Sequence, residues 1–490
     1  MRDYAPKRRT ALVLAGSGTS GAYHAGVLKA LDESGTKVDV LVGSGAGAIA
    51  AAYGAVAGGA KLYGAGGFWD GVSTAVFLRL RPALRVVLVI LMVTATVFLL
   101  PLALALLAGV AFPFALLADV FAPGFVSRML AQYGPQAESL RSAYVVGLAV
   151  PAFALAGLSC GYLAVSYLRQ RRRFAEGFES PLDPSPGRRR LARGLWEIAR
   201  SSALSVGAPT PIEIGRRYVA LAADNLGQPG FRELIVRAAD LDTGGSLALV
   251  LLEDAPRAAF LKARSRNSRS LPGGMPGVVD LRAPGYDALF FEAVASGLLP
   301  PGTAPISRVT FPKGGPHAGE THRLADAALV AGCGIAEALA AGAEQVIVAT
   351  AVPEKPSLPL RRRGPRATAE ALAATLERQA VENDLGAAQR INRMVETLGH
   401  TTNEGRRAWE DPATGRQYRD FGLYVIRPER RELGPLEFDG AEHPGTEVRE
   451  TAHDLLEQGY RDAYRMFIEP VLGAAPVAHR EEEVEKGVGL

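Results

Sequence analysis

Two glycine-rich turns near the start of the chain have spacing typical of reactive sites, and the first is suited to holding an anion. The first spans Gly16 to Gly21, after the apolar run Ala11 to Ala15 and before a stretch with helical apolar spacing. A strand, a glycine turn and a helix together expose backbone N–H groups, which can hold an anion or a developing oxyanion. The candidate oxyanion-loop residues are Gly16, Ser17, Gly18 and Gly21.

The second turn has the spacing of a nucleophile elbow but no nucleophile at its centre. The apolar strand Val38 to Val42 runs into a Gly-Ser-Gly-Ala-Gly turn and then into a helix of small residues. Small residues two before and two after the centre suit a strained strand-to-helix turn, and Gly43 and Gly47 occupy these positions. Gly45, at the centre, tolerates the strained backbone but offers no oxygen.

Two other interpretations of these turns stay open. Ser44 is an alternative nucleophile, but the β-branched Val42 then takes the place of a small flanking residue, and a strand-end side chain points differently from an elbow centre. Gly16 to Gly21 also has the G-x-G-x-x-G spacing of a dinucleotide site, which is a weak signal alone. Asp39 lies at about the right distance for the acid of such a site, but it precedes the strand residues Val40 to Val42 instead of ending the strand. A nucleotide-binding membrane protein is therefore a further alternative.

The motifs, taken in order, resemble those of the patatin-like phospholipase (PNPLA-domain) family over roughly residues 10–352. Gly16 to Leu28 is similar to the family's glycine loop, and the turn centred on Gly45 is similar to its G-x-S-x-G elbow. Leu324 to Val330 is similar to the segment that carries the dyad aspartate, so the resemblance implies that Asp326 has this role. It also implies a serine–aspartate dyad that attacks a lipid ester while the glycine loop holds the oxyanion.

The chain departs from the family pattern where the chemistry depends on it. The family's serine aligns with Gly45, and the basic residue of its glycine loop aligns with Ser20. Because loss of a nucleophile costs several orders of magnitude in rate, we expect a catalytically impaired, membrane-anchored protein that binds or senses lipid. The alternatives are an active lipid acyl hydrolase that uses Ser44, and attack by water assisted by Asp326. If the dyad assignment is right, Asp326 should point at Gly45 with room for the missing side chain.

Two long apolar runs interrupt the predicted catalytic domain. Residues 86–118 and 143–168 carry no charge, and a membrane-spanning helix needs about 20 apolar residues. Basic residues between Arg79 and Arg85 precede the first run, and others between Arg169 and Arg173 follow the second. The positive-inside rule then places both ends of the hairpin in the cytoplasm. We expect an integral protein of a bacterial inner membrane, with two spans and with the soluble domain and both termini cytoplasmic.

The predicted fold is an α/β parallel sheet covered by helices, with the two-helix transmembrane hairpin inserted and a mainly helical C-terminal region. The expected segments are 10–80 and 174–352 for the two parts of the patatin-like domain, 81–173 for the hairpin, and 353–490 for the C-terminal region, which packs on the core.

Composition limits the partners. The net charge is +4, and the basic clusters lack interleaved aromatic residues, so we expect no nucleic acid partner. Membrane lipid or an acyl ester and the bilayer itself are the expected partners, and the sequence leaves the oligomeric state open. His317 and His322 flank Glu320, but the spacing is not H-E-x-x-H, so we expect no metal and no cofactor.

Overall fold

The structure is a computed structural model, in which the chain divides into two compact units that we consider separately. Unit 1 is Met1–Arg79 with Pro184–Leu490, and unit 2 is Leu80–Asp183. The basic residues at 171–173 lie outside the described residues. The described residues are 4–56, 59–72, 77–169, 182–200, 209–267, 277–298, 307–313, 317–355, 365–402, 406–412, 417–429, 441–442 and 449–473.

Unit 1 contains a central sheet of nine described strands. Seven follow one another in the order β14-β10-β1-β2-β5-β6-β7, while β9 pairs with β5 and β8 pairs with β9. β14, β10, β1, β2 and β5 are parallel, and the apolar runs in β1, β2 and β10 match strands buried on both faces. The bounds are β1 Thr10–Gly16, β2 Val40–Gly45, β5 Glu233–Asp240, β6 Gly245–Leu251, β7 Gly277–Asp280, β8 Ser307–Thr310, β9 Thr321–Asp326, β10 Gln345–Thr350 and β14 Gly422–Ile426.

One strand exchange in this sheet matters for the site. The first half of β5 pairs with β2 as far as Arg237, opposite Ser44. The rest of β5 pairs antiparallel with β9, beginning with Ala238 opposite Asp326. β9 therefore continues the sheet beyond the carboxyl end of β2 and brings its own last residue toward the turn that follows β2.

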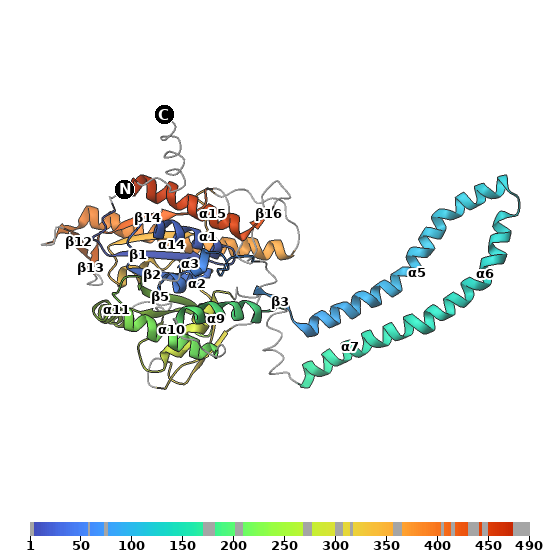
Figure 1. Ribbon diagram of the computed structural model, residues 1–490, viewed down its shortest axis with the longest axis horizontal. Helices are drawn as coiled ribbons and strands as arrows, with labels where there is room; N and C mark the ends of the chain where they lie inside the picture. Colours follow the sequence, from blue (N-terminus) through green and yellow to red (C-terminus); the bar gives the residue numbers. More distant parts are fainter. Residues whose placement is uncertain are drawn as a thin grey trace, which may run out of the picture. The chain divides into compact units, whose positions relative to one another are not determined.

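Helices cover both faces of the sheet (Figure 1). Alternate residues of β1 and β2, such as Val13 and Val42, pack with the helices of one face in the main hydrophobic core. Those helices are α11 Asp254–Asn267, α13 Ile335–Ala340 and α14 Pro365–Leu398. The helices on the side of α1 and α2 are α1 Ser20–Glu33, α2 Ala46–Gly54, α3 Gly59–Tyr63, α9 Ser185–Ala199, α10 Pro211–Asn225, η2 Tyr286–Leu289 and α12 Phe290–Ser296.

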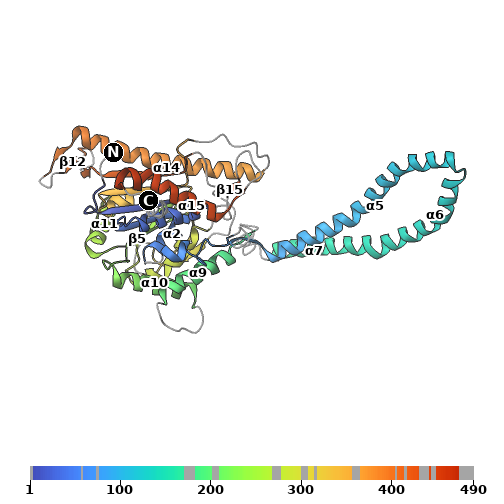
Figure 2. The ribbon, with the colours of Figure 1, turned by 45° about the horizontal axis from the view of Figure 1, so that its top comes forward.

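The C-terminal part of the chain packs onto this core rather than standing apart. Figure 2 shows the long α14 in orange and α15 in red. Residues of α14 belong to the main hydrophobic core, whereas α15 packs against α1. α15 contacts α1 closely, because Gly26 and Gly459 leave no side chain between the two helices. The remaining elements are β11 His400–Thr401, β12 Arg407–Glu410, β13 Gln417–Arg419, β15 Ala441–Glu442, β16 Arg449–Glu450, α15 Ala452–Ala463 and η3 Tyr464–Leu472.

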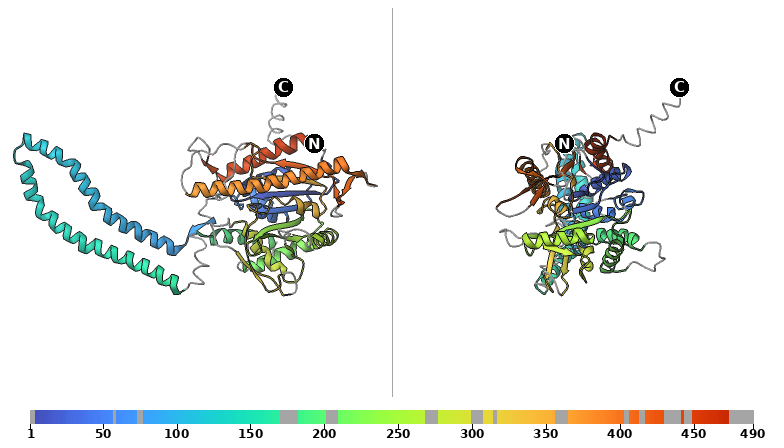
Figure 3. Two further views of the ribbon diagram at one scale, coloured as in Figure 1. Left: turned by 180° about the vertical axis from the view of Figure 1, so that it is seen from behind. Right: turned by 90° about the vertical axis from the view of Figure 1, so that its left-hand side faces the viewer.

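Unit 2 consists mainly of long helices. α5, α6 and α7 follow one another along the chain, and α7 lies beside α5 (Figure 3). The Phe98 ring of α5 and the Phe153 ring of α7 lie 6.1 Å apart. The short strands β3 and β4 pair with each other. The bounds are β3 Arg79–Leu80, α5 Pro82–Phe121, α6 Phe125–Tyr144, η1 Val145–Ala149, α7 Val150–Arg169 and β4 Leu182–Asp183.

The prediction of a transmembrane hairpin at residues 81–173 is wrong. The apolar runs do form helices, but among the residues that the structure describes, none of the helices combines the length and the apolar character that crossing a bilayer requires. The predicted localisation as a two-span integral membrane protein with cytoplasmic termini rested on these spans and is wrong for the same reason. The α/β part of the predicted fold, a largely parallel sheet covered by helices, is present in unit 1.

Candidate functional site

The two glycine turns meet at the carboxyl ends of neighbouring strands. β1 and β2 are parallel, and their register places Gly16 opposite Gly45. Gly45 is also the residue from which α2 begins, with φ +64° and ψ −135°. This backbone conformation favours glycine, since a Cβ would be strained there. The chain therefore turns sharply from strand to helix at Gly45, as expected for the centre of an elbow.

Asp326 faces the same point from β9. A Cβ atom built on Gly45 would lie 2.6 Å from Asp326 Oδ1 and 2.5 Å from the Gly16 carbonyl oxygen. The Ala328 methyl group would lie 3.0 Å away. The Asp326 side chain thus points at Gly45, as the dyad assignment requires, but there is no room for the missing side chain. Neighbouring atoms occupy the space that a serine Cβ would need.

The Asp326 carboxyl group is fully buried, with its two oxygens in different surroundings. Oδ1 accepts a hydrogen bond of 2.8 Å from the Ala328 N–H, while Oδ2 has no partner of normal geometry among the described residues. Burial raises the pKa of Asp326 to about 7, although the nearby Ser17 hydroxyl and the Ala328 N–H both act to lower it. The group can therefore exist as a neutral acid or as a carboxylate near neutral pH.

The glycine loop lies next to this carboxyl group and is itself buried. The N–H groups of Ser20 and Gly21 donate within the loop, to Ser17 and Gly18, at 3.2 Å each. Within the described part of the chain, the hydroxyl groups of Ser17 and Ser20 lack hydrogen-bond partners of normal geometry. The two hydroxyl groups are therefore polar groups of the loop that a ligand near Asp326 could hydrogen-bond.

Three residues near the site were not expected from the sequence. The Glu377 carboxylate, on α14, lies 3.1 Å from where a Gly16 Cβ would be, and a Gly297 Cβ would come within 2.0 Å of the Gly45 carbonyl oxygen. His24 is buried on α1, and burial lowers its pKa to about 3 despite the nearby carbonyl groups of β1 and β10. No local sequence pattern connects Glu377 with Gly16, since only the packing of α14 brings them together.

Ser44 lies away from this arrangement. Side chains alternate between the faces of a strand, so Ser44 shares the face of Val42, while Gly45 has the opposite side. The Ser44 hydroxyl donates to the Cys333 carbonyl at 3.4 Å and accepts from Arg237 Nη1 at 3.3 Å. The structure thus brings Gly45 and Asp326 together and places Ser44 in a different buried polar cluster.

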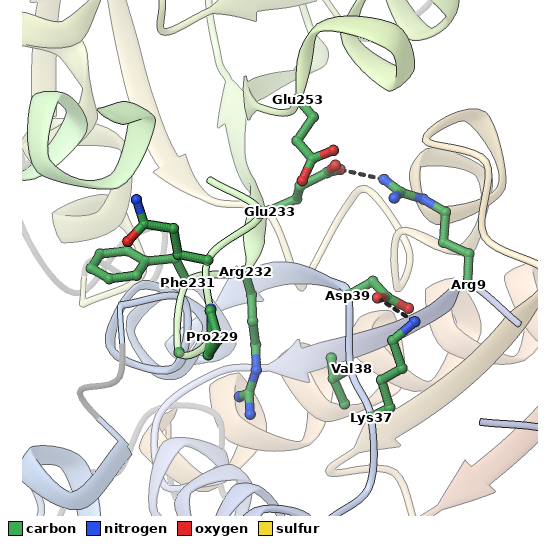
Figure 4. Close-up of a pocket in the computed structure, with 12 residues that line it drawn as sticks. Arg9, Lys37, Val38, Asp39, Pro229, Phe231, Arg232, Glu233 and Glu253 are labelled. Carbon is green, nitrogen blue, oxygen red and sulfur yellow. Dashed lines mark hydrogen bonds and ion pairs between the residues drawn. The ribbon is translucent and has the colours of Figure 1, made fainter. Parts of the chain in front are cut away.

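Asp39 lies far from the glycine loop, at the amino end of β2. Its carboxylate accepts from the Thr10 N–H at 2.8 Å and pairs with Lys37 at 3.0 Å. Figure 4 shows Asp39 beside a cavity of about 360 Å³, which Arg9 and Glu233 also line. This cavity lies at the amino ends of β1, β2 and β5, so it is separate from the turns at their carboxyl ends. Asp39 therefore cannot serve a dinucleotide bound at the glycine loop.

A match to a family model agrees with the glycine loop and the elbow. The model of the family described as patatin-like phospholipase matches residues 12–85, which contain both turns. The resemblance to patatin-like phospholipases is thereby confirmed for this part of the chain. Solved structures that match include VipD from Legionella pneumophila, at 12% identity and a TM-score of 0.30, over 94% of this chain and 67% of VipD. No curated protein matches the chain.

Proposed function

We propose that this chain is a patatin-like protein that binds a lipid or acyl ester without hydrolysing it through a serine–aspartate dyad. One observation carries the proposal, namely the closed space at Gly45. A dyad serine would need its Cβ atom 2.5 Å from the Gly16 oxygen and 2.6 Å from Asp326 Oδ1, which is closer than van der Waals contact allows. Glycine thus removes the nucleophilic oxygen, and the neighbouring groups fill its place.

The groups that remain are suited to binding an oxygen-rich head or ester. Asp326 Oδ2 and the hydroxyls of Ser17 and Ser20 are buried polar atoms that lack partners of normal geometry within the described residues. Such groups are costly to bury, so a ligand oxygen or hydroxyl that satisfies them would bind favourably. The lipid class follows from the family match at residues 12–85. Since Asp326, Ser17 and Ser20 are themselves fully buried, binding requires the site to open.

Two measurements on the full chain test this proposal. A fluorophosphonate probe, which labels activated serines, should leave the protein unlabelled. A short-chain fluorescent phosphatidylcholine should bind saturably while releasing no fatty acid above the protein-free blank. Asp326→Ala, which removes the polar group without adding volume to the closed site, should weaken binding by about tenfold, the loss expected for one hydrogen bond in a buried site.

Ser44→Ala is the matched control, because Ser44 lies close in sequence to Gly45 but faces the other side of the sheet. This variant should bind the fluorescent lipid as the unmodified chain does. Hydrolysis or probe labelling that disappears in Ser44→Ala would favour the alternative, an acyl hydrolase with Ser44 as its nucleophile. Hydrolysis that survives Ser44→Ala but is lost in Asp326→Ala would favour water activated by Asp326.

A further inference from the structure

A second polar cluster lies at the start of β9, the strand that ends at Asp326. His317 Nδ1 lies 3.2 Å from Glu320 Oε2, and His322 Nε2 lies 3.1 Å from the same oxygen. All three potential ligand atoms lie within 4.8 Å of one another. Two imidazoles thus converge on one carboxylate oxygen. The spacing H-x-x-E-x-H does not suggest this in the sequence, because it depends on the turn before β9.

The buried side of the cluster is held by β5. Asp240 Oδ2 lies 2.6 Å from His322 Nδ1, in contact across the β5–β9 pairing. With Nδ1 engaged in this way, Nε2 is the nitrogen that His322 presents to Glu320. A carboxylate behind an imidazole fixes the ring and its tautomer, and this arrangement is typical of histidines that bind metal.

The turn that carries His317 is held in a conformation that few residues adopt. His317 has φ +61°, and within the described residues it alone has a positive φ without being glycine. Its carbonyl accepts from the Glu320 N–H at 2.9 Å, and the Phe311 ring packs against both imidazoles, at 5.3 and 4.9 Å between ring centres. Backbone strain of this kind persists where the surroundings impose it, commonly at functional sites. Here it turns His317 toward the other two side chains.

We propose that His317, Glu320 and His322 bind a divalent first-row transition metal ion such as Zn²⁺, with Asp240 as the positioning residue behind His322. Two histidines and one carboxylate are an established zinc ligand set that leaves one coordination position open. Zinc–ligand bonds of about 2.0–2.1 Å place neighbouring tetrahedral ligands roughly 3.3 Å apart. The separations of 3.2 and 3.1 Å to Glu320 are close to this value, and the two histidine nitrogens lie within 4.8 Å of each other.

A metal-free hydrogen-bond network is the competing explanation. Burial lowers the pKa of His322, but its hydrogen bonds to Asp240 and Glu320 outweigh this effect and raise it. A protonated His322 could then bridge the two carboxylates without any metal. The two explanations differ in one respect that can be measured, since only the first predicts stoichiometric binding of Zn²⁺.

The test is a titration of the full chain with Zn²⁺, after treatment with a chelator, in competition with a chromophoric zinc indicator. We expect one ion per chain and, with Co²⁺ in its place, the visible absorption of a four-coordinate ion. Glu320→Gln should weaken binding at least tenfold, and this variant should fold normally because the side chain is 63% exposed. His453→Ala, at an exposed histidine outside the cluster, is the matched control and should bind as the unmodified chain does.

Asp240→Asn tests the positioning role separately, because all three ligands remain. We expect affinity to fall by about tenfold, with the cobalt spectrum retained but shifted. Absence of stoichiometric binding in the unmodified chain would overturn the proposal, as would equal affinity in Glu320→Gln. These outcomes do not depend on lipid binding, so this inference and the proposed function can fail independently.

Discussion

Introducing a Cβ atom at Gly45 tests how tightly the site is closed. Gly45→Ala places a methyl group 2.5 Å from the Gly16 carbonyl oxygen and 2.6 Å from Asp326 Oδ1, and neither can easily move. The first belongs to the backbone of β1, and the second is held by the Ala328 N–H at 2.8 Å. Overpacking of this kind costs about 1–3 kcal/mol, and the sparsely populated backbone conformation of φ +64° and ψ −135° adds roughly 1–3 kcal/mol. We therefore expect the free energy of unfolding to fall by about 2–6 kcal/mol.

Gly35→Ala is a control for a positive φ without crowding. Gly35 has φ +67°, close to the +64° of Gly45, but a Cβ there would have no atom within 4 Å. Its loss of stability should therefore reflect backbone strain alone, roughly 1–2 kcal/mol. Urea denaturation of the two variants measures the difference. If Gly45→Ala were no more destabilising than Gly35→Ala, the space at Gly45 would be open and our reasoning about the closed site would be refuted.

The same closure predicts that Gly45→Ser alone does not restore a working dyad. The serine side chain would have to displace Asp326 or the glycine loop to fit. The serine hydroxyl and the Asp326 carboxyl group would then not be held in the geometry that proton transfer between them requires. Fluorophosphonate labelling of this variant should stay at background. Stoichiometric labelling would show that the site opens to accept a serine and that the glycine alone blocks catalysis.

The other predictions concern Asp326, Ser44 and the α1–α15 contact. The pKa of Asp326 is about 7 in the folded chain, against an ordinary value of 3.8. The neutral acid therefore stabilises the fold fully below about pH 4, and this stabilisation, roughly 4 kcal/mol, is lost as the pH rises through 7. Asp326→Asn has no ionisable group here, so the urea midpoint of the unmodified chain should fall relative to that of the variant between pH 4 and pH 8. A difference in midpoint that stays constant with pH would contradict the buried acid. Ser44→Ala should cost about 1 kcal/mol in urea denaturation, the loss of a modest buried hydrogen bond, and a much larger loss would point to a further role. Gly26→Ala puts a Cβ 1.8 Å from the Leu456 carbonyl oxygen, so hydrogen exchange in α15 should become faster. Gly386→Ala, in the more open α14, is the control and should leave exchange in α15 unchanged. Equal exchange rates in the two variants would mean that the α1–α15 contact is loose.

Much of the framework was predictable from local sequence. Continuous apolar runs and glycine turns predicted β1, β2 and the helices after them, because strand burial and sharp turns depend on nearby residues. The order of the motifs predicted that Asp326 would face the elbow, and it does. The prediction of membrane spans, drawn from the same kind of local pattern, was wrong.

The remaining features depend on contacts between residues far apart in the chain. β9 takes the place of β2 beside β5, and this exchange sets the distance between Asp326 and Gly45. Whether a side chain fits there is decided by the Gly16 carbonyl oxygen and Ala328, which no spacing rule describes. Likewise, Asp240 reaches His322 only because β5 and β9 pair.

The sequence by itself determined that the elbow has no nucleophile, because residue identity at Gly45 is a local fact. Only the tertiary structure decided that the vacant position is filled by its neighbours. The physical reason is that packing is a property of all atoms around a point, and those atoms come from β1, β9 and the turn after it.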